Sequence, residues 1–434
     1  MIQPSGSTDT KRTAVFFYLS DKKIFKRKSI QWAQQYSTIV ALDNNDYTSH
    51  LHQKETYLLA VGKKNEIFTS ENCFSKLQNF ITENAGWKFG FISYDAKNEI
   101  ENLLSKNTEH LNFPLLHFFI PEILIRIKDE GVEIISSVKN ESEIFHAINN
   151  TEIIDAHLPS FPEVKTNMTD DEYLSKVENV KEHIRQGNVY ELNLCRQFYC
   201  QHYQCNPLSL YFVLNEISPA PFSAFYKLEN KYLLCASPER FLLKQGNIIT
   251  SQPMKGTSRR SEEASADKNL REQLFNSEKD RAENVMIVDL VRNDLSRSCM
   301  AGTVQVDELF GIYSYPRIHQ MVSTVSGELR NESTISEAIK NAFPMGSMTG
   351  APKIRAMQLI DELENSKRGL FSGTVGYINN ENDFDFNVVI RSIQYDSEKK
   401  YLSFSAGGAI TIDSNAQAEL EEIQLKSAVI RNIL

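Results

Sequence analysis

Short apolar runs separated by polar turns fill the first 150 residues of the chain. YLLAVG at 57–62 and WKFGFISYDA at 87–96 are rich in β-branched and aromatic residues, and Asn and Lys mark the turns between such runs. This pattern predicts an α+β region with mostly antiparallel strands. A polar stretch around Pro159 follows. We therefore expect one large α+β domain with an N-terminal region, 1–155, and a second region, 160–434, that carries the chemistry.

Signals for individual elements are sharper in the second region. Thr169, with Glu172 three residues later, has the form of a capping box and predicts a helix that runs to about Gln186. Residues 222–250 contain strand-like runs separated by turns, and the Gly-Asn pair at 246–247 suits a tight hairpin. This part of the chain therefore predicts a helix followed by an antiparallel strand meander.

Two later helices each carry a pair of acidic residues. We predict one helix from Asn276 or Ser277 to about Leu295 and another over 416–434. The acidic pairs are Asp280 with Glu283 on the first helix and Glu419 with Glu422 on the second. Residues three apart share a helical face, so four carboxylates would require a hard cation such as Mg²⁺ if the two faces met. Otherwise the pairs are solvated surface, and Lys426 beside Glu422 fits a salt-bridged surface stripe equally well.

The composition is that of an ordinary globular chain with an acidic surplus. The 434 residues are 41% hydrophobic and 24% charged, with a net charge of −9. Nucleic acid and anionic membranes attract a surplus of Lys and Arg, so we expect neither as a partner, and an anionic substrate would need a local cationic site. The N-terminus has no secretory pattern, no apolar run can span a bilayer, and the six cysteines form no CxxC pair. These features favour a cytoplasmic protein with reduced thiols.

Three glycine-bearing turns are candidates for binding an anion. They are PMKGT at 253–257, PMGSMTGAPK at 344–353 and AGGAITIDS at 406–414. Backbone N–H groups in such turns can hold a carboxylate or phosphate, although each segment can equally be a simple turn. None matches the Walker A pattern or the dinucleotide fingerprint, so nucleotide binding is not the leading hypothesis.

Lys255 and Glu239 are candidates for acid–base or nucleophilic chemistry. Lys255 follows a β-rich run, and it is either a surface ammonium or a desolvated amine with a lowered pKa that acts as nucleophile or base. Glu239 is either a general acid or the partner of Arg240 in a salt bridge at the end of a strand. The sequence pattern leaves both choices open.

Taken together, the segments over 160–434 resemble the chorismate-utilising enzyme family. The matching motifs are YELNLCRQF, ASPERFL, PMKGT, DRAENVMIVDLVRNDL, YPRIHQMVSTVSGEL, FPMGSMTGAPKIRAMQLIDELE, GLFSGTVGY, DFNVVIRSI and AGGAITIDS. The N-terminal region matches more weakly, through GWKFGFISYDAKNEIENL. The resemblance implies two large antiparallel β-sheets packed face to face and flanked by helices, with chorismate and Mg²⁺ in a cleft between them.

The resemblance also implies roles for individual residues. Glu283 and Glu422 match the direct magnesium ligands, and Asp280 and Glu419 match the outer acids that hold its waters. Arg391 matches the arginine that takes the enolpyruvyl carboxylate, a task suited to a bidentate guanidinium. The positions that match further substrate contacts are Lys426, Gly407, Gly408, Ser347, Thr349 and His319, the last being similar to a family histidine beside the substrate.

Two positions divide the family. Relatives that form anthranilate typically have alanine where Lys255 stands, whereas para-directed aminating relatives have lysine. In the latter the amine is expected to add at ring C2 while Glu239 protonates the leaving C4 hydroxyl, and ammonia then displaces the lysine by attack at C4. Glu191 stands where water-activating relatives have lysine and aminating relatives have glutamine. A glutamate argues against water as nucleophile and leaves its own role open.

The resemblance therefore implies formation of 4-amino-4-deoxychorismate from chorismate and ammonia, for 4-aminobenzoate and folate synthesis. The alternative is anthranilate formation for tryptophan synthesis, and a noncatalytic chorismate-binding protein is disfavoured because both acid pairs, Glu239 and Lys255 are present. The sequence contains no glutaminase signature, so we expect ammonia from a separate glutamine amidotransferase subunit. Without an LLES-type motif, feedback inhibition by tryptophan is doubtful. We also expect burial, Mg²⁺ and Arg391 to lower the pKa of Lys255 below about 10.4.

Overall fold

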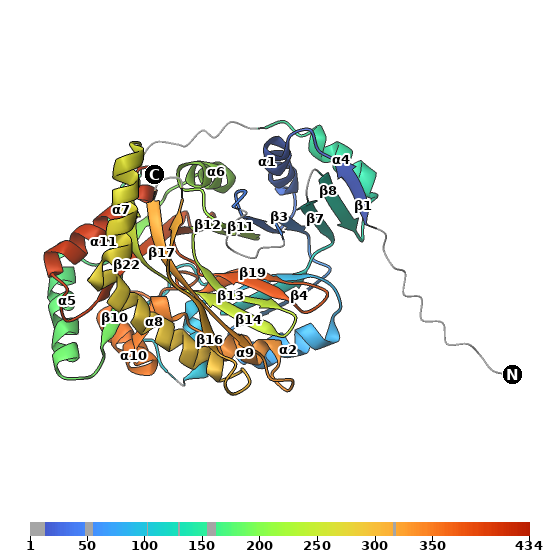
Figure 1. Ribbon diagram of the computed structural model, residues 1–434. Helices are drawn as coiled ribbons and strands as arrows, with labels where there is room; N and C mark the ends of the chain where they lie inside the picture. The colour runs from blue at the N-terminus through green and yellow to red at the C-terminus, as the bar shows by residue number, and fades with distance from the viewer. Residues whose placement is uncertain (1–13, 48–54, 102, 129–130, 154–161, 316–317) are drawn as a thin grey trace.

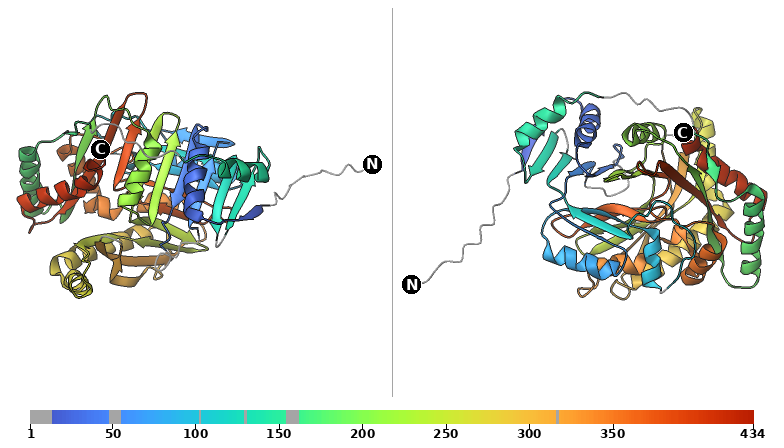
Figure 2. Two further views of the ribbon diagram at one scale, coloured as in Figure 1. Left: turned by 90° about the horizontal axis from the view of Figure 1, so that it is seen from above. Right: turned by 180° about the vertical axis from the view of Figure 1, so that it is seen from behind.

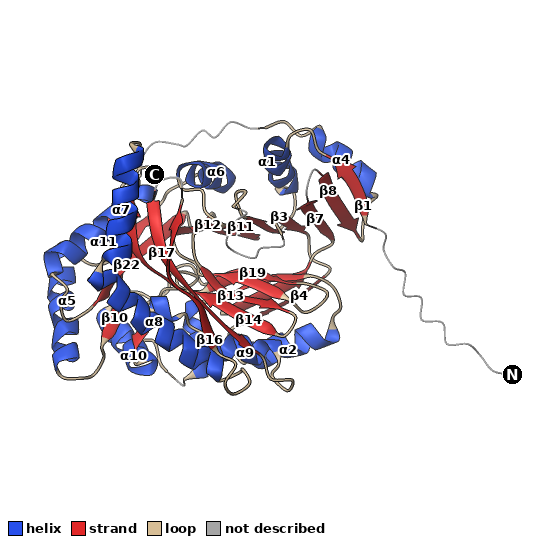
Figure 3. Cartoon of the chain, in the orientation of Figure 1, coloured by secondary structure: helices blue, strands red, loops and turns tan. Residues whose placement is uncertain are grey.

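Two antiparallel β-sheets lie face to face in the computed structural model of the protein, and helices cover their outer sides (Figure 1). The structure describes residues 14–47, 55–101, 103–128, 131–153, 162–315 and 318–434. Colouring by secondary structure makes the layers plain (Figure 3). The predicted α+β class with two large packed sheets is confirmed.

The first sheet contains strands from both regions of the chain. Its order is β1 (Val15–Tyr18), β8 (Gly131–Ser136), β7 (Ile123–Lys128), β3 (Tyr57–Val61), β2 (Thr38–Asp43), β11 (Phe222–Leu228), β12 (Lys231–Ser237), β21 (Ser392–Asp396), β22 (Tyr401–Ile410), β10 (Glu191–Cys200) and β18 (Gly350–Ala351), and β9 (Lys165–Thr166) pairs with β10. The two regions meet where β2 pairs with β11, in a register that places Asp43 opposite Ser223.

The second sheet is also built from both regions. Its order is β15 (Met254–Arg259), β17 (Ile318–Glu328), β14 (Ile248–Gln252), β13 (Arg240–Gln245), β20 (Phe384–Asn387), β19 (Thr374–Ile378), β5 (Lys88–Ile92), β6 (Leu116–Ile120) and β4 (Asn65–Thr69), and β16 (Gln305–Ser314) pairs with β17. Here the regions meet where β5 pairs with β19. The division at 155–160 stays a prediction, and most of the stretch around Pro159 lies outside the described residues.

Helices cover the outer faces of the sheets. Over the first sheet lie α1 (Lys22–Ala33), α4 (Glu141–Asn149) and α6 (Pro207–Ile217), and over the second lie α2 (Cys73–Glu83), α8 (Glu278–Ser296) and α9 (Ile335–Ala342). Three more helices, α5 (Asp170–Arg185), α10 (Lys353–Leu363) and α11 (Ala416–Arg431), pack on β10 or β22. Both views of Figure 2 place α5 and α11 at the end of the molecule remote from α4. The remaining helices are α7 (Ala264–Asn276), beside β15 to β17, the short α3 (Lys97–Ile100), and the 3₁₀ turns η1 (Tyr94–Ala96) and η2 (Gly346–Met348).

The local signals in the sequence mark these elements well. Thr169 and Glu172 form the predicted capping box at the start of α5, and Ser277 caps α8 through a hydrogen bond to the backbone of Asp280. The turn at 246–247 joins β13 to β14 as a hairpin. These predictions are confirmed because caps and tight turns depend on contacts within a few residues.

Apolar side chains fill the space between the sheets. Leu58, Tyr226 and Leu233 from the first sheet pack with Phe89 and Phe91 from the second, and all are buried. The outer faces of the strands are buried under the helices, so YLLAV in β3 is buried at every position. Strands that are covered on both faces read as continuous apolar runs, which explains the pattern of the N-terminal region.

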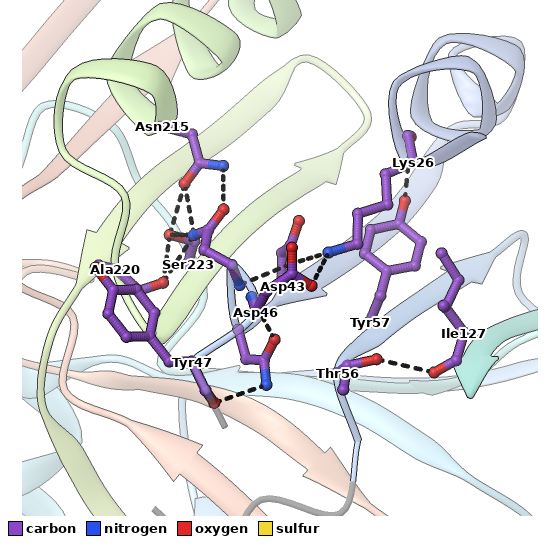
Figure 4. Close-up of polar contacts among 12 residues, drawn as sticks. Lys26, Asp43, Asp46, Tyr47, Thr56, Tyr57, Ile127, Asn215, Ala220 and Ser223 are labelled. Carbon is purple, nitrogen blue, oxygen red and sulfur yellow. Dashed lines mark hydrogen bonds and ion pairs between the residues drawn. The ribbon is translucent and has the colours of Figure 1, made fainter. Parts of the chain in front are cut away.

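Polar contacts fix the loop that follows α6 (Figure 4). The amide of Asn45 donates to Asn215 Oδ1 at 3.0 Å and to the carbonyl of Ala220 at 2.8 Å. The hydroxyl of Tyr47 donates to the carbonyl of Pro219 at 3.3 Å. The N-terminal region therefore holds residues 219 and 220 in place, beside the cavity described below.

The described residues contain neither a membrane-spanning helix nor a disulfide bond. None of the helices among the described residues is long and apolar enough to cross a bilayer. All six cysteines are free thiols, as expected from their spacing.

The packing between the sheets gives a stability prediction. Phe91→Ala removes a fully buried ring that packs against Phe113 and Tyr226, and it should lower the free energy of unfolding by about 3 to 5 kcal/mol. Phe68→Ala is the control, because Phe68 is 68% exposed on edge strand β4 and its loss should cost less than about 0.5 kcal/mol. Urea denaturation of both variants measures the difference, and equal losses would contradict the packing described here.

Candidate active site

A cavity of about 760 Å³ lies where the chain crosses between the two sheets. Glu239 connects β12 to β13 and Arg391 connects β20 to β21, and each of these connections joins one sheet to the other. Most of the predicted site residues line this cavity, namely Glu239, Lys255, Asp280, Glu283, Ser347, Arg391, Gly407, Glu422 and Lys426. Residues far apart in the sequence thus meet in one place.

Lys255 is buried in the wall of the cavity and held by a carboxylate. Its Nζ donates to Glu191 Oε1 at 2.6 Å and lies 4.0 Å from Glu283 Oε2. Burial lowers the pKa of Lys255, but the charges of Glu191, Glu283 and Glu239 outweigh burial and raise it above its ordinary value. The expected lowering is therefore wrong for this structure, because three carboxylates surround the amine. The alternative of a surface ammonium is excluded as well.

Glu191 is the closest partner of that amine. It begins β10 in the first sheet and is only 1% exposed. While Oε1 accepts from Lys255, Oε2 has no hydrogen-bond partner among the described residues. A buried carboxylate oxygen without a hydrogen bond lowers the stability of the folded protein, and the ion pair with Lys255 offsets part of that loss.

Glu239 is buried and protonates readily. Ser347 Oγ donates to its Oε1 at 2.7 Å. Burial raises its pKa to about 7, although the Ser347 hydroxyl and the charge of Lys255 act in the opposite direction. Arg240 binds Asp385 instead, through two hydrogen bonds of 2.9 Å. Near neutral pH, Glu239 can therefore carry a proton into the cavity.

The two acidic helix faces meet at the cavity. Lys279 Nζ lies 3.8 Å from Glu283 Oε1 on its own helix and 3.8 Å from Glu419 Oε1 on α11. On α11, Glu422 pairs with Lys426 at 2.7 Å. Burial raises the pKa of Glu283 to about 7, helped by Glu191 and Asp280, and burial with the nearby Glu422 charge raises that of Glu419. The alternative of solvated surface acids is therefore wrong for Glu283 and Glu419, which are buried, whereas Glu422 and Lys426 form the expected salt bridge on the exposed part of α11.

The carboxylate set suits a hard divalent cation in its chemistry. Mg²⁺ prefers carboxylate oxygens and keeps several waters, so it needs few direct protein ligands. Asp280 belongs to the same set and lies against Gly256, where a Cβ atom would approach its Oδ1 to 2.8 Å. As the side chains lie, however, no three His, Cys, Asp or Glu groups among the described residues are close enough to hold a metal ion. Lysines compensate the acids instead.

Two cationic groups, Arg391 and Lys426, also line the cavity. Arg391 has no carboxylate partner among the described residues, and burial lowers its pKa. Lys426 Nζ donates to the carbonyl of Gly407 at 3.0 Å. At Gly407 a Cβ atom would come within 2.4 Å of Cys195 Sγ, and at Gly408 within 3.1 Å of Glu419 Oε2. Glycine at both positions therefore lets β22 approach β10 and the acidic helix closely.

Five predicted site residues are not part of the cavity lining, namely Glu191, His319, Thr349, Gly408 and Glu419. Glu191, Gly408 and Glu419 contact residues that are part of it or lie next to it. His319 points away from it, with Nε2 3.0 Å from Asp267 Oδ1 and Nδ1 2.8 Å from Ser314 Oγ. Thr349 donates to the carbonyl of Met345 within its own turn. The assignment of His319 and Thr349 as substrate contacts stays a prediction, and their placement lends it no support.

Gln320 is a cavity residue that the sequence analysis missed. It follows His319 in β17, and successive residues of a strand face opposite sides. Its Nε2 donates to the carbonyl of Gly256 at 2.7 Å, and it lines the cavity. The alternation along β17 is the signal that could have found it.

A buried ion pair behind the cavity was also missed. Arg368 pairs with Glu364, four residues earlier in the loop after α10, and donates to the carbonyls of Asn193 and Met348 at 2.9 and 2.6 Å. Asn193 Nδ2 in turn donates to the carbonyl of Ser347 at 3.1 Å. The pair therefore holds the turn that carries Ser347, which in turn holds Glu239. Its i, i+4 spacing was the only local signal.

The fold and the cavity together define a two-sheet α+β protein whose cavity is lined by carboxylates, lysines and arginines. A family model described as chorismate binding enzyme matches residues 16–432. The chain therefore belongs to the chorismate binding enzyme family.

Individual relatives agree with the family. The chain is 37% identical over 371 residues to the chloroplastic aminodeoxychorismate synthase of Arabidopsis thaliana, covering 80% of this chain and 40% of that protein. It is 32% identical over 365 residues to aminodeoxychorismate synthase component 1 of Bacillus subtilis (strain 168), covering 80% and 77%. The chain thus spans less than half of the plant relative and about three quarters of the bacterial one.

A solved structure shares the fold. The crystal structure of anthranilate synthase component I from Streptococcus pneumoniae TIGR4 superposes with a TM-score of 0.76 at 25% identity, covering 89% of this chain and 94% of that chain. This likeness supports the two-sheet architecture implied by the sequence motifs.

The buried carboxyl of Glu239 gives a prediction about stability and pH. The ordinary pKa of 4.5 applies to the unfolded chain, and the folded pKa is about 7. Between these values the unfolded chain releases its proton first, so this group's contribution to folding is complete below pH 4.5 and is lost as the pH rises through 7. Glu239→Gln should therefore raise the free energy of unfolding at pH 8 by about 1 to 3 kcal/mol and much less at pH 5. Urea titrations at both pH values test this, and a destabilised variant at pH 8 would contradict it.

Proposed function

We propose that the chain converts chorismate and ammonia to 4-amino-4-deoxychorismate, as the names of its aminodeoxychorismate synthase relatives suggest. The observation that carries this proposal is the position of Lys255, whose amine lies inside the cavity between the carboxylates of Glu191 and Glu283. A lysine at this position is what the sequence comparison within the family associates with amination at C4. The pathway served is that of 4-aminobenzoate and folate.

The proposed reaction is a double displacement. Lys255 first passes a proton to Glu191, 2.6 Å away. Its neutral amine then adds at ring C2, the two ring double bonds shift, and the C4–O bond breaks while Glu239 donates its proton, so that water leaves. Ammonia then adds at C4, the double bonds shift back, and the C2–N bond to Lys255 breaks with its electron pair returning to the amine. The new C4 ammonium gives a proton back to Glu239, and Glu191 returns its proton to Lys255. The sum is chorismate plus ammonia giving 4-amino-4-deoxychorismate plus water. The raised pKa of Glu239 supports its role as the acid.

Different residues of the cavity would hold the substrate and the metal. Arg391 would take the enolpyruvyl carboxylate, since it is a guanidinium without a carboxylate partner among the described residues. Glu283 and Glu422 would bind Mg²⁺ directly, and Asp280 and Glu419 would hold its waters. When bound, the metal supplies positive charge for the ring carboxylate of the substrate. Lys426 and the 407–408 turn would complete the binding of that carboxylate.

The source of ammonia is part of the proposal. The sequence shows no nucleophilic cysteine in a glycine-rich elbow, and all six cysteines have other surroundings, five of them buried. The bacterial relative is named a component 1. We therefore assign glutamine hydrolysis to a separate amidotransferase subunit.

A product assay tests the proposed function and distinguishes it from anthranilate formation, the reaction named for the Streptococcus pneumoniae structure. The purified chain with chorismate, Mg²⁺ and ammonium should form 4-amino-4-deoxychorismate, identified by chromatography and mass. Glutamine in place of ammonium should give no product, and EDTA should abolish activity reversibly. Anthranilate as the main product would overturn the proposal, and robust glutamine-dependent turnover would overturn the separate ammonia source.

Removing Lys255 tests the covalent route. Lys255→Ala should lower amination at C4 by roughly 10²-fold or more, the scale of losing one positioned catalytic group. Residual turnover should shift toward amination at C2. Native protein incubated with chorismate and Mg²⁺ but no ammonia should carry an adduct on the peptide that contains Lys255, seen by mass spectrometry. Native rates in the variant, together with an unmodified peptide, would rule out Lys255 as the nucleophile.

A further inference from the structure

Lys279 connects the two acidic helices at the mouth of the cavity. Its Nζ is 3.8 Å from Glu283 Oε1 on α8 and 3.8 Å from Glu419 Oε1 on α11. By contrast, Lys426 pairs with Glu422 on its own helix, and Lys255 is held by Glu191. Within the described residues, Lys279 is thus the cation that ion-pairs with both helices.

The ion pairs of Lys279 with Glu283 and Glu419 offset the repulsion between these two acids, but each pair is weak. Glu283 and Glu419 are largely buried, and two facing carboxylates repel each other unless a cation lies between them. However, the distances of 3.8 Å exceed those of a hydrogen bond, and the Lys279 side chain is 58% exposed. Exposed ion pairs contribute little, so another cation can replace this one.

We propose that Lys279 is an exchangeable counter-ion, which holds the acidic helices together in the metal-free protein and is displaced when Mg²⁺ binds. The inference rests on the magnesium site of the proposed function. Mg²⁺ binds oxygen ligands at about 2.1 Å, so a metal bound to Glu283 displaces the ammonium from that carboxylate, and the waters that Glu419 would hold displace it from the other. The flexible four-carbon stem of a lysine lets the ammonium move into water. Lys279 thereby lowers the apparent affinity for the metal and keeps the empty site neutralised.

Calorimetric titration with MgCl₂ gives the first test. Lys279→Met should bind Mg²⁺ about 3- to 10-fold more tightly than native protein, because the metal no longer competes with two weak ion pairs. Lys268→Met is the matched control. Among the described residues, Lys268 on α7 ion-pairs with Glu272 alone, at 3.8 Å, and is 76% exposed. This variant therefore loses the same charge without removing an ion pair of the four acids, and it should bind within about 2-fold of native. Unchanged or weaker binding by Lys279→Met would overturn the inference.

Amine labelling separates displacement from a long-range effect of charge. In native protein, acetylation of Lys279 by a water-soluble succinimidyl ester should rise at least about 2-fold when Mg²⁺ is added, because the freed ammonium becomes accessible. Lys268 in the same sample serves as the internal control and should not change. Peptide mass spectrometry reads both sites. Labelling of Lys279 that stays constant or falls would show that the metal does not displace it.

The outcomes for this inference and for the function are distinct. Native protein that binds Mg²⁺ and exposes Lys279, yet forms no aminated product, would overturn the proposed function and leave the counter-ion role standing. Protein that forms the aminated product, but whose Lys279 labelling does not change with Mg²⁺, would overturn the counter-ion role and leave the proposed function standing. Native protein that does not bind Mg²⁺ at all would overturn the counter-ion role and the proposed metal site together.

Discussion

The ion pair between Lys255 and Glu191 joins the two sheets at the place where the cavity opens. Lys255 belongs to β15 of the second sheet and Glu191 to β10 of the first, and their side chains meet at 2.6 Å. A buried pair of this kind gains stability only if its charges are well matched, because both lose their hydration. More than one carboxylate lies near this single amine, so the remaining negative charge has to be neutralised by protonation or by other cations of the site.

The balance of charge explains several features of the cavity. Glu239 and Glu283 have pKa values raised to about 7 because burial disfavours their charged forms. Lys279 lies beside Glu283 and Glu419, Lys426 pairs with Glu422, and Arg391 remains available for an anion. Binding of a cation and a dianionic substrate would complete this balance. Perturbed pKa values of this kind cluster at functional sites.

The positions of the charged groups depend on a rigid frame behind them. Arg368 and Glu364 hold the backbone of β10 and η2 together. Asn45 and Tyr47 of the N-terminal region bind the carbonyls of Ala220 and Pro219. Both sheets draw strands from the two ends of the chain. The N-terminal region therefore supports the cavity even though few of its residues reach it.

The sequence by itself determined several of the elements, the family and most of the charged residues of the cavity. Capping boxes, hairpin turns and acidic pairs three residues apart are local features, and local contacts form them. Only the tertiary structure decided that the acidic faces of α8 and α11 meet, that three carboxylates raise the pKa of Lys255, and that β17 presents Gln320 rather than His319 to the cavity. Burial and charge pairing arise between residues far apart in the chain, so no pattern of spacing along the sequence can show them.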